Sequence, residues 1–182
     1  MIRQDPVIVL TAAYSLAVIF TASAWVKIAD IPSFEAAVAD YGLLPAELVK
    51  VFASVLPIVE FTAAIGLVVG YTRFLAAAVL LLLLGCFTAA IAANLIRGRR
   101  DIDCGCFGPA LRQQLSGWLL LRNGTLIAAG FAVLLPANER SPSGFDYLTV
   151  SFAVVALVLI YAAANFLMAI SPRILQYEMR DA

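Results

Sequence analysis

The chain has 182 residues, of which 63% are hydrophobic and 13% are charged, and its formal net charge is zero. Soluble domains are about half apolar and about one-quarter charged, so this composition predicts an integral membrane protein and gives no indication of a nucleic-acid partner. The sequence contains no histidine. Its absence removes the commonest metal ligand and general base, and it counts against haem, zinc-hydrolase and Ser/His chemistry.

Five apolar stretches are long enough to cross a bilayer, which takes about 20 helical residues. We therefore predict an all-α integral membrane helix bundle, a multi-pass protein of the cell (inner or plasma) membrane that forms one domain over residues 1–182. The predicted spans cover residues 7–26, 47–70, 74–96, 116–135 and 147–170. The first stretch has a second interpretation as a signal peptide, because Ala22-Ser23-Ala24 is typical of a cleavage site. Its length and its unbroken continuation into Lys27 favour a span.

The loop after the first span, residues 27–46, has the spacing of a short amphipathic helix around Phe34 and Tyr41, followed by Gly42 and Pro45. Lys27, at the end of the first span, is interpreted as a lysine that snorkels to the membrane surface.

Two polar side chains lie within the next two predicted spans. Glu60 follows Pro57 by one turn near the middle of the second span, where an ionisable group should face the bundle interior. It is either a structural carboxyl that is hydrogen-bonded to a neighbouring helix or a functional group. Cys86 lies near the middle of the third span, where a buried cysteine usually acts as a small hydrophobe and a redox role is the alternative.

The loop between the third and fourth spans carries the motif Asp103-Cys104-Gly105-Cys106-Phe107-Gly108-Pro109. A disulfide between Cys104 and Cys106 closes a very small ring, and such strain makes a disulfide easier to reduce. Gly105 allows the tight turn that this ring needs. The nearby arginines at 97, 99, 100 and 112 favour a reactive thiolate, whereas Asp101 and Asp103 oppose it.

Thiol–disulfide exchange is the favoured interpretation of this motif, and its loop position keeps both sulfurs within reach of a partner protein. Three others stay open: a structural disulfide, which would be a poor staple for so short a loop; half of a metal site completed by Asp101, Asp103 or a second subunit; and an idle pair of thiols.

The topology predicts a polar cluster beneath the cysteine loop. Two crossings separate the first and third loops, so both lie on the same face of the membrane. Arg122 and Asn123 lie in the first two turns of the fourth span, with Arg122 about 9 Å below that face at 1.5 Å per residue. Asn94 lies at the matching end of the third span, and Glu60 is a further candidate for the floor of the site.

The pattern resembles the MauE family of methylamine-utilisation membrane proteins, which is related to a broader DoxX-like group. The motif that starts at Asp103, followed by a span that opens with Ser, Trp and Arg-Asn, is the specific part of this resemblance. The other matching positions are Lys27, Asp30, Phe34, the segment 41–45, Pro57 and Glu60.

The resemblance implies four core helices plus a fifth, similar to vitamin K epoxide reductase-type bundles. It also implies work with a thioredoxin-like, membrane-tethered or exported partner in forming or correcting the disulfides of an exported enzyme, which is methylamine dehydrogenase in the name family. The expected catalytic residues are Cys104 and Cys106, and a quinone near Glu60 or Arg122 is a possible electron carrier. The expected supporting residues are Arg122, Asn123, Glu60, Asn94, Phe107 and Gly108.

Two alternatives to an oxidoreductase are kept. A non-redox assembly factor would bind its partner through the surface around Phe107 and Pro109, and a thiolate metal carrier would use the two cysteines as ligands. Orientation is also contested. The face of the cysteine loop carries more Lys and Arg than the other face, which predicts that it is cytoplasmic, whereas a role on exported disulfides places it outside.

Overall fold

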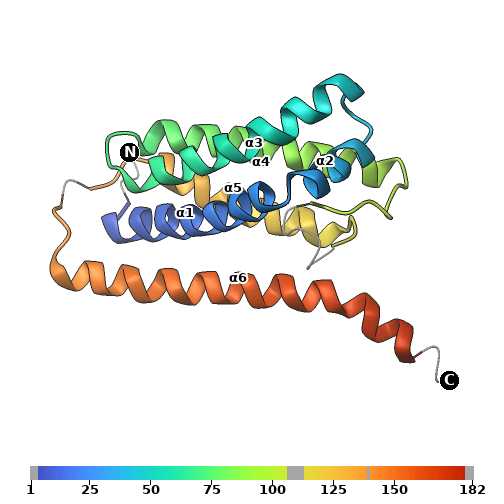
Figure 1. The fold of residues 1–182 in the computed structure, drawn as a ribbon. Helices are drawn as coiled ribbons and strands as arrows, with labels where there is room; N and C mark the ends of the chain where they lie inside the picture. Colours follow the sequence, from blue (N-terminus) through green and yellow to red (C-terminus); the bar gives the residue numbers. More distant parts are fainter. Residues whose placement is uncertain (1–3, 106–112, 139, 179–182) are drawn as a thin grey trace.

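The structure is a computed structural model. It describes residues 4–105, 113–138 and 140–178, with side chains described as far as residue 170. Within these ranges the chain folds into helices, and the longest connection between them is the cysteine loop, residues 97–116 (Figure 1). The helices are α1 (Pro6–Ala29), α2 (Ile31–Asp40), α3 (Ala46–Val68), α4 (Arg73–Ile96), α5 (Gly117–Leu134) and α6 (Gly144–Glu178).

All of these helices except α2 contain a segment that is long and apolar enough to cross a membrane. They correspond to the five predicted spans, with bounds that differ by a few residues, and the all-α membrane bundle is confirmed. The short helix α2 occupies the loop where the sequence predicted an amphipathic helix. The protein is therefore a multi-pass membrane protein with one additional helix at the membrane surface.

Aspartates define the starts of the first two helices. The Asp5 carboxylate accepts a hydrogen bond from the amide of Val7 at 2.9 Å, and Pro6 occupies the first turn of α1. Asp30 ends α1 and begins α2, where its carboxylate accepts from the amide of Ser33 at 3.1 Å. Hydrogen bonds from Ser33 hold the pKa of the Asp30 carboxyl below its ordinary value. This carboxylate fixes the sharp turn between a membrane-spanning helix and a surface helix.

The end of α4 closes with a Schellman motif, which sets the direction of the chain as it enters the cysteine loop. Gly98 has a φ of 76°, a left-handed conformation that glycine adopts without a steric penalty. Its amide donates to the carbonyl of Leu95 at 3.0 Å, and the amide of Arg99 donates to that of Asn94, also at 3.0 Å. The side chain of Arg99 turns back and donates to the carbonyl of Asp40 at 3.0 Å, so the ends of α2 and α4 are joined.

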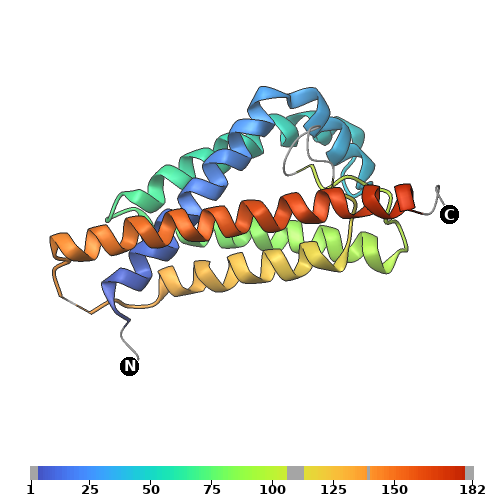
Figure 2. The same ribbon diagram turned by 90° about the horizontal axis from the view of Figure 1, so that it is seen from below.

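α1 lies in the middle of the bundle and packs against α3, α5 and α6, while α4 packs against α3 and α5 (Figures 1 and 2). Fully buried alanines such as Ala13 on α1 and Ala64 on α3 allow these helices to approach closely. α6 runs along one side of the bundle, and its apolar segment, Gly144–Ile170, is the least buried of the five spans. This arrangement is the predicted bundle of four core helices plus a fifth.

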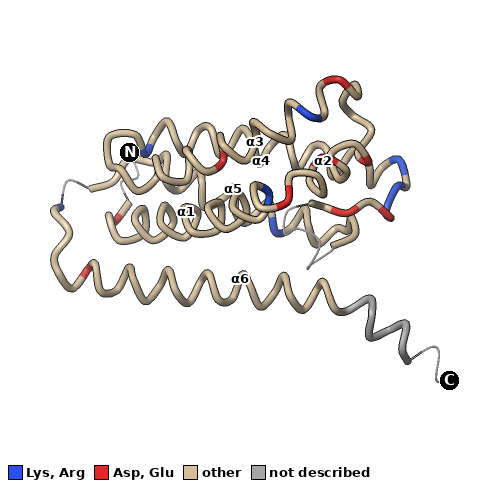
Figure 3. The backbone as a smooth tube through the Cα atoms, in the orientation of Figure 1, with Lys and Arg blue, Asp and Glu red and all other residues tan. Residues whose placement is uncertain are grey.

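Charged residues gather at the end of the bundle that carries α2 and the loop after α4 (Figure 3). The cysteine motif belongs to that loop, so the charged end of the molecule is also the end that holds the candidate site.

Candidate functional site

The cysteine loop is held at its base by a short antiparallel pairing of its two arms. The amide of Cys104 donates to the carbonyl of Gln113 at 2.9 Å, and the amide of Leu115 donates to the carbonyl of Ile102 at 3.1 Å. Ile102 and Leu115 are buried in one apolar cluster with the start of α5. These contacts fix Cys104 at a defined position above the bundle, although the sequence predicted only a loop here.

Gly105 adopts a left-handed φ of 70°. A Cβ atom at this position would lie 3.0 Å from the Cβ of Ala37 on α2, which is closer than such atoms normally approach. Glycine is therefore required both by the backbone conformation and by the close packing of α2. Gly105 thus has the left-handed backbone that a tight turn needs and lies against the surface helix α2, while the turn predicted from Cys104 to Cys106 extends outside the described residues.

Cys104 is only 8% exposed and is therefore shielded. The sequence analysis had expected the opposite, a sulfur that its loop position leaves within reach of a partner. The other motif residues proposed for the site, Cys106, Phe107 and Gly108, lie outside the described residues, as does Pro109.

Arg122 lies directly beneath Cys104. Its Nη2 atom is 3.8 Å from the Sγ atom of Cys104, and the residue is only 5% exposed. The same guanidinium donates to the side-chain oxygens of Asn123 at 3.1 Å, Asn165 at 3.3 Å and Gln113 at 3.4 Å. We refer to Arg122, Asn123, Gln113 and Asn165 as the arginine cluster. Its hydrogen bonds hold a cation against the thiol.

The arginine cluster joins four parts of the chain: α4, α5, α6 and the cysteine loop. Asn123 donates to Thr88 on α4 at 3.2 Å, and Gln113 donates to the backbone carbonyl of Asn165 on α6 at 2.8 Å. Sequence reasoning identified Arg122 and Asn123 but missed Gln113 and Asn165. A sequence signal for Asn165 was available: it is an amide side chain in an otherwise apolar span, and such a side chain should be buried against a polar partner.

The arginines near the motif in sequence are arranged differently from the prediction. Arg97 and Arg100 are exposed, and Arg99 donates to the backbone carbonyls of Asp40 and Tyr41. The contact with Cys104 comes from Arg122, which is more distant in sequence and lies within a span. The structure shows no contact of Arg97, Arg99 or Arg100 with Cys104 among the described residues, and Arg112 lies outside them, so the effect of these arginines on the thiolate stays a prediction.

A second buried polar group lies deeper in the bundle. The Nζ atom of Lys27 on α1 lies 2.7 and 2.6 Å from the two carboxylate oxygens of Glu60 on α3, and the two side chains are 2% and 1% exposed. The rings of Phe34 and Phe87 also face the ammonium, at 5.2 and 5.1 Å from their centroids. The interpretation of Lys27 as a snorkelling lysine is wrong, because its charge is paired inside the bundle.

Asn94 is fully buried, but it does not form the floor of the cysteine site as the sequence analysis predicted. It contacts the end of α2 instead. Its side-chain amide donates to the backbone carbonyls of Tyr41 at 3.3 Å and Ala90 at 3.2 Å. Its side-chain oxygen accepts from Arg99 at 3.4 Å. These bonds fasten the end of α2 to α4, and they position the helix that covers Gly105.

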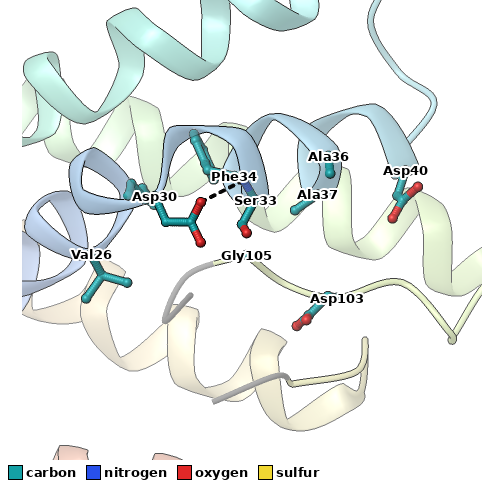
Figure 4. A pocket seen from close by; sticks show the side chains of 10 residues that line it. Val26, Asp30, Ser33, Phe34, Ala36, Ala37, Asp40, Asp103 and Gly105 are labelled. Carbon is teal, nitrogen blue, oxygen red and sulfur yellow. Dashed lines mark hydrogen bonds between the residues drawn. The ribbon is translucent and has the colours of Figure 1, made fainter. Parts of the chain in front are cut away.

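A polar cleft of about 160 Å³ lies between α2 and the cysteine loop (Figure 4). Asp30, Ser33 and Asp40 line it from α2 and its cap, and Asp103 and Gly105 line it from the loop. Within the described residues, no three Cys, Asp or Glu side chains are placed to hold a metal ion. The polar side chains of this cleft reach the cysteine loop at Asp103 and Gly105.

The fold and the site together define a small multi-pass membrane protein that holds a shielded thiol against a buried arginine at one membrane face. The family model described as "Methylamine utilisation protein MauE" matches residues 5–136. The chain belongs to this family.

Curated relatives carry the name "Methylamine utilization protein MauE". The protein from Paracoccus denitrificans is 36% identical over 164 residues, covering 90% of this chain and 88% of the relative. Those from Methylophilus methylotrophus and Methylorubrum extorquens are 37% and 38% identical, covering 90% and 88% of this chain and 87% of each relative. No solved structure gives a significant match.

Proposed function

We propose that this protein is a membrane-embedded thiol–disulfide oxidoreductase that supports disulfide formation during the maturation of an exported enzyme. The exchange partner is a thioredoxin-like protein that is tethered to the membrane or exported. The name of the family points to methylamine dehydrogenase as the type of enzyme that is matured. The contact between Arg122 and Cys104 carries this proposal.

The arginine contact supports the proposal because the thiolate is the reactive form of cysteine. A cation 3.8 Å from the sulfur favours this form. The expected exchange is balanced within the two proteins: a partner thiolate attacks the Cys104–Cys106 disulfide, and the partner's second thiol then resolves the mixed disulfide. The partner gains a disulfide, and Cys104 and Cys106 become a dithiol. A strained disulfide in so small a ring is a favourable oxidant for this step.

Single substitutions of the motif cysteines should separate the two chemical roles. We expect Cys104→Ser and Cys106→Ser each to abolish exchange, and one of them to accumulate a mixed disulfide with the partner. Cys86→Ser is the matched control and should exchange as the unmodified protein does. The measurement is non-reducing electrophoresis of the protein captured from membranes, followed by mass spectrometry of the linked peptides.

The double variant Cys104→Ser/Cys106→Ser tests the scaffold alternative. If this variant still supports full maturation of the exported enzyme, thiol–disulfide exchange is not the function, and a role as a non-redox assembly factor takes its place.

The proposal requires the cysteine loop to face the outside of the cell membrane. We expect that a membrane-impermeant maleimide added to intact cells after mild reduction will label the motif cysteines, with Cys86→Ser used to remove the third thiol. An engineered cysteine at Arg73, the first residue of α4 and therefore on the opposite face, should be labelled only after the cells are opened. The reverse pattern would place the loop in the cytoplasm, as the Lys and Arg count predicts, and would contradict the proposed role.

A further inference from the structure

An apolar cavity of about 240 Å³ lies between α2, α3 and α4, and Cys104 forms part of its wall. Aromatic side chains line much of the rest: Phe34 and Tyr41 from the α2 region, Phe52 from α3, and Phe87 from α4. Cys86 also lines this cavity, and it is exposed, unlike the buried residue that the sequence analysis expected. The cavity is distinct from the polar cleft on the other side of α2.

The open side of this cavity faces the lipid. Its lining includes Leu43 and Phe52, which are 42% and 36% exposed, and the exposed Cys86. Phe52 lies about 9 Å from the start of α3, and Cys86 about 15 Å from the end of α4, at 1.5 Å per residue. The opening therefore extends from the membrane surface into the hydrocarbon region, and a ligand reaches it by diffusion within the bilayer.

We propose that this cavity binds a lipid-soluble quinone that accepts the electrons of the motif cysteines. The inference rests on the proposed redox function and names its electron acceptor. Cys104 is only 8% exposed, and the cavity connects it with the lipid. An acceptor that approaches by this route must be apolar, flat enough for an aromatic-lined cavity and able to take two electrons and two protons. Quinones meet these requirements.

The volume agrees with a single substituted ring. A cavity of about 150 Å³ holds benzene, so 240 Å³ accommodates a substituted benzoquinone ring whose tail extends into the lipid. The space near Glu60 and Arg122, where the sequence analysis placed a quinone, is different. That cavity measures about 40 Å³, which is room for about one water molecule at 30 Å³ each. The cavity between α2, α3 and α4 is therefore the better fit to a quinone ring than the space near Glu60 and Arg122.

The redox step is balanced by the quinone. The S–H bonds of Cys104 and Cys106 break and one S–S bond forms, while two electrons and two protons pass to the quinone and convert its two carbonyl groups into hydroxyls. Arg122, which does not line this cavity, stabilises the Cys104 thiolate through the contact at 3.8 Å. The regenerated disulfide is then available for exchange with the partner.

The test uses the full chain in lipid nanodiscs and a decyl-benzoquinone that carries a photoreactive azide. We expect light-dependent labelling of peptides around Phe34–Tyr41 and Phe52, competition by unlabelled decylubiquinone, and protection of Cys86 from N-ethylmaleimide by the same quinone. Anaerobic addition of decylubiquinone to the reduced protein should oxidise Cys104, as read by alkylation and mass spectrometry.

Two alanines on α4 give a matched pair of variants. Ala90 lines the cavity, whereas its neighbour Ala89 is exposed and does not. Ala90→Phe should fill the cavity and remove both the labelling and the protection of Cys86, while Ala89→Phe should leave both unchanged. Thermal unfolding shows whether each variant is folded, and Ala90→Leu, with a smaller side chain, replaces Ala90→Phe if that variant does not fold.

Three outcomes overturn the inference: labelling that is equal in the Ala89→Phe and Ala90→Phe variants, labelling elsewhere on the lipid-facing surface only, and phospholipid acyl chains that resist displacement by the quinone. These results are distinguishable from failure of the proposed function. A protein that exchanges disulfides with its partner but binds no quinone retains the function with another acceptor. A protein that exchanges no disulfides loses the function itself.

Discussion

Glutamine in place of Glu60 is expected to lower the free energy of unfolding by about 3–5 kcal/mol, because it leaves the buried ammonium of Lys27 without its carboxylate. The pair is almost completely buried, at 2% and 1% exposure, and its members lie on α1 and α3, which pack closely. An unpaired charge at this depth must be neutralised, drawn to the surface or solvated by water that enters the bundle. Each of these responses disturbs the α1–α3 contact.

The measurement is a double-mutant cycle with Glu60→Gln, Lys27→Met and the variant carrying both, unfolded reversibly in mixed micelles and followed by circular dichroism. The free energy of unfolding of the double variant should fall by much less than the sum of the decreases in the two single variants, because neither charge is then left unpaired. Glu47→Gln and Lys50→Met, at exposed positions of the same helix α3, are the matched controls and should change stability by no more than about 0.5 kcal/mol. Two results would contradict this prediction: single variants that lose no more free energy of unfolding than the controls, or changes that are fully additive in the double variant.

The membrane spans were predictable because their signal is local. About 20 consecutive apolar residues suffice to indicate a crossing, and the predicted stretch 74–96 differs from α4 (Arg73–Ile96) by a single residue at its start. Glu60 was correctly expected to face the bundle interior for a similar reason, since a carboxylate in the middle of a span has no favourable alternative. These predictions require no knowledge of which helices are neighbours.

The partners of these residues were not predictable, because they depend on packing between distant segments. Lys27 is 33 positions from Glu60 in the sequence, and a lysine near a helix end snorkels unless the fold supplies a buried carboxylate. The contact of Asn165 with Arg122 spans 43 positions. It exists only because the outermost helix, α6, lies beside the site.

In the cysteine loop, too, the local feature was predictable and the long-range contacts were not. The glycine between the two cysteines indicated a tight turn, and Gly105 has the left-handed backbone that this requires. The pairing of the loop's two arms and the cover provided by α2 could not be inferred from the motif. They depend on Ile102 and Leu115 being drawn into one apolar cluster and on Ala37 meeting Gly105.

Removing the Arg122 cation should slow the reaction of Cys104 with a neutral alkylating reagent. We expect Arg122→Met to lower the alkylation rate of Cys104 at neutral pH by on the order of tenfold, which corresponds to about 1.4 kcal/mol of lost thiolate stabilisation. Arg122→Lys keeps the charge but not the planar group that bonds to Asn123, Gln113 and Asn165, so it should retain part of the rate. In the Met variant the rate should recover at higher pH, where the thiolate forms without help from a cation.

The rate is measured by mass spectrometry of the Cys104 peptide, with Cys86 of the same molecule as the internal reference. Arg97→Met is the matched control, because Arg97 is close to the motif in sequence but exposed, and it should leave the rate unchanged. Unfolding would raise the alkylation rate, because it exposes Cys104, which is only 8% exposed in the folded protein. A slower reaction therefore cannot arise from unfolding. An unchanged rate in Arg122→Met, or equal slowing in Arg97→Met, would mean that the arginine beneath the loop has a structural role alone. The contact between Arg122 and Cys104 would then no longer support the redox proposal.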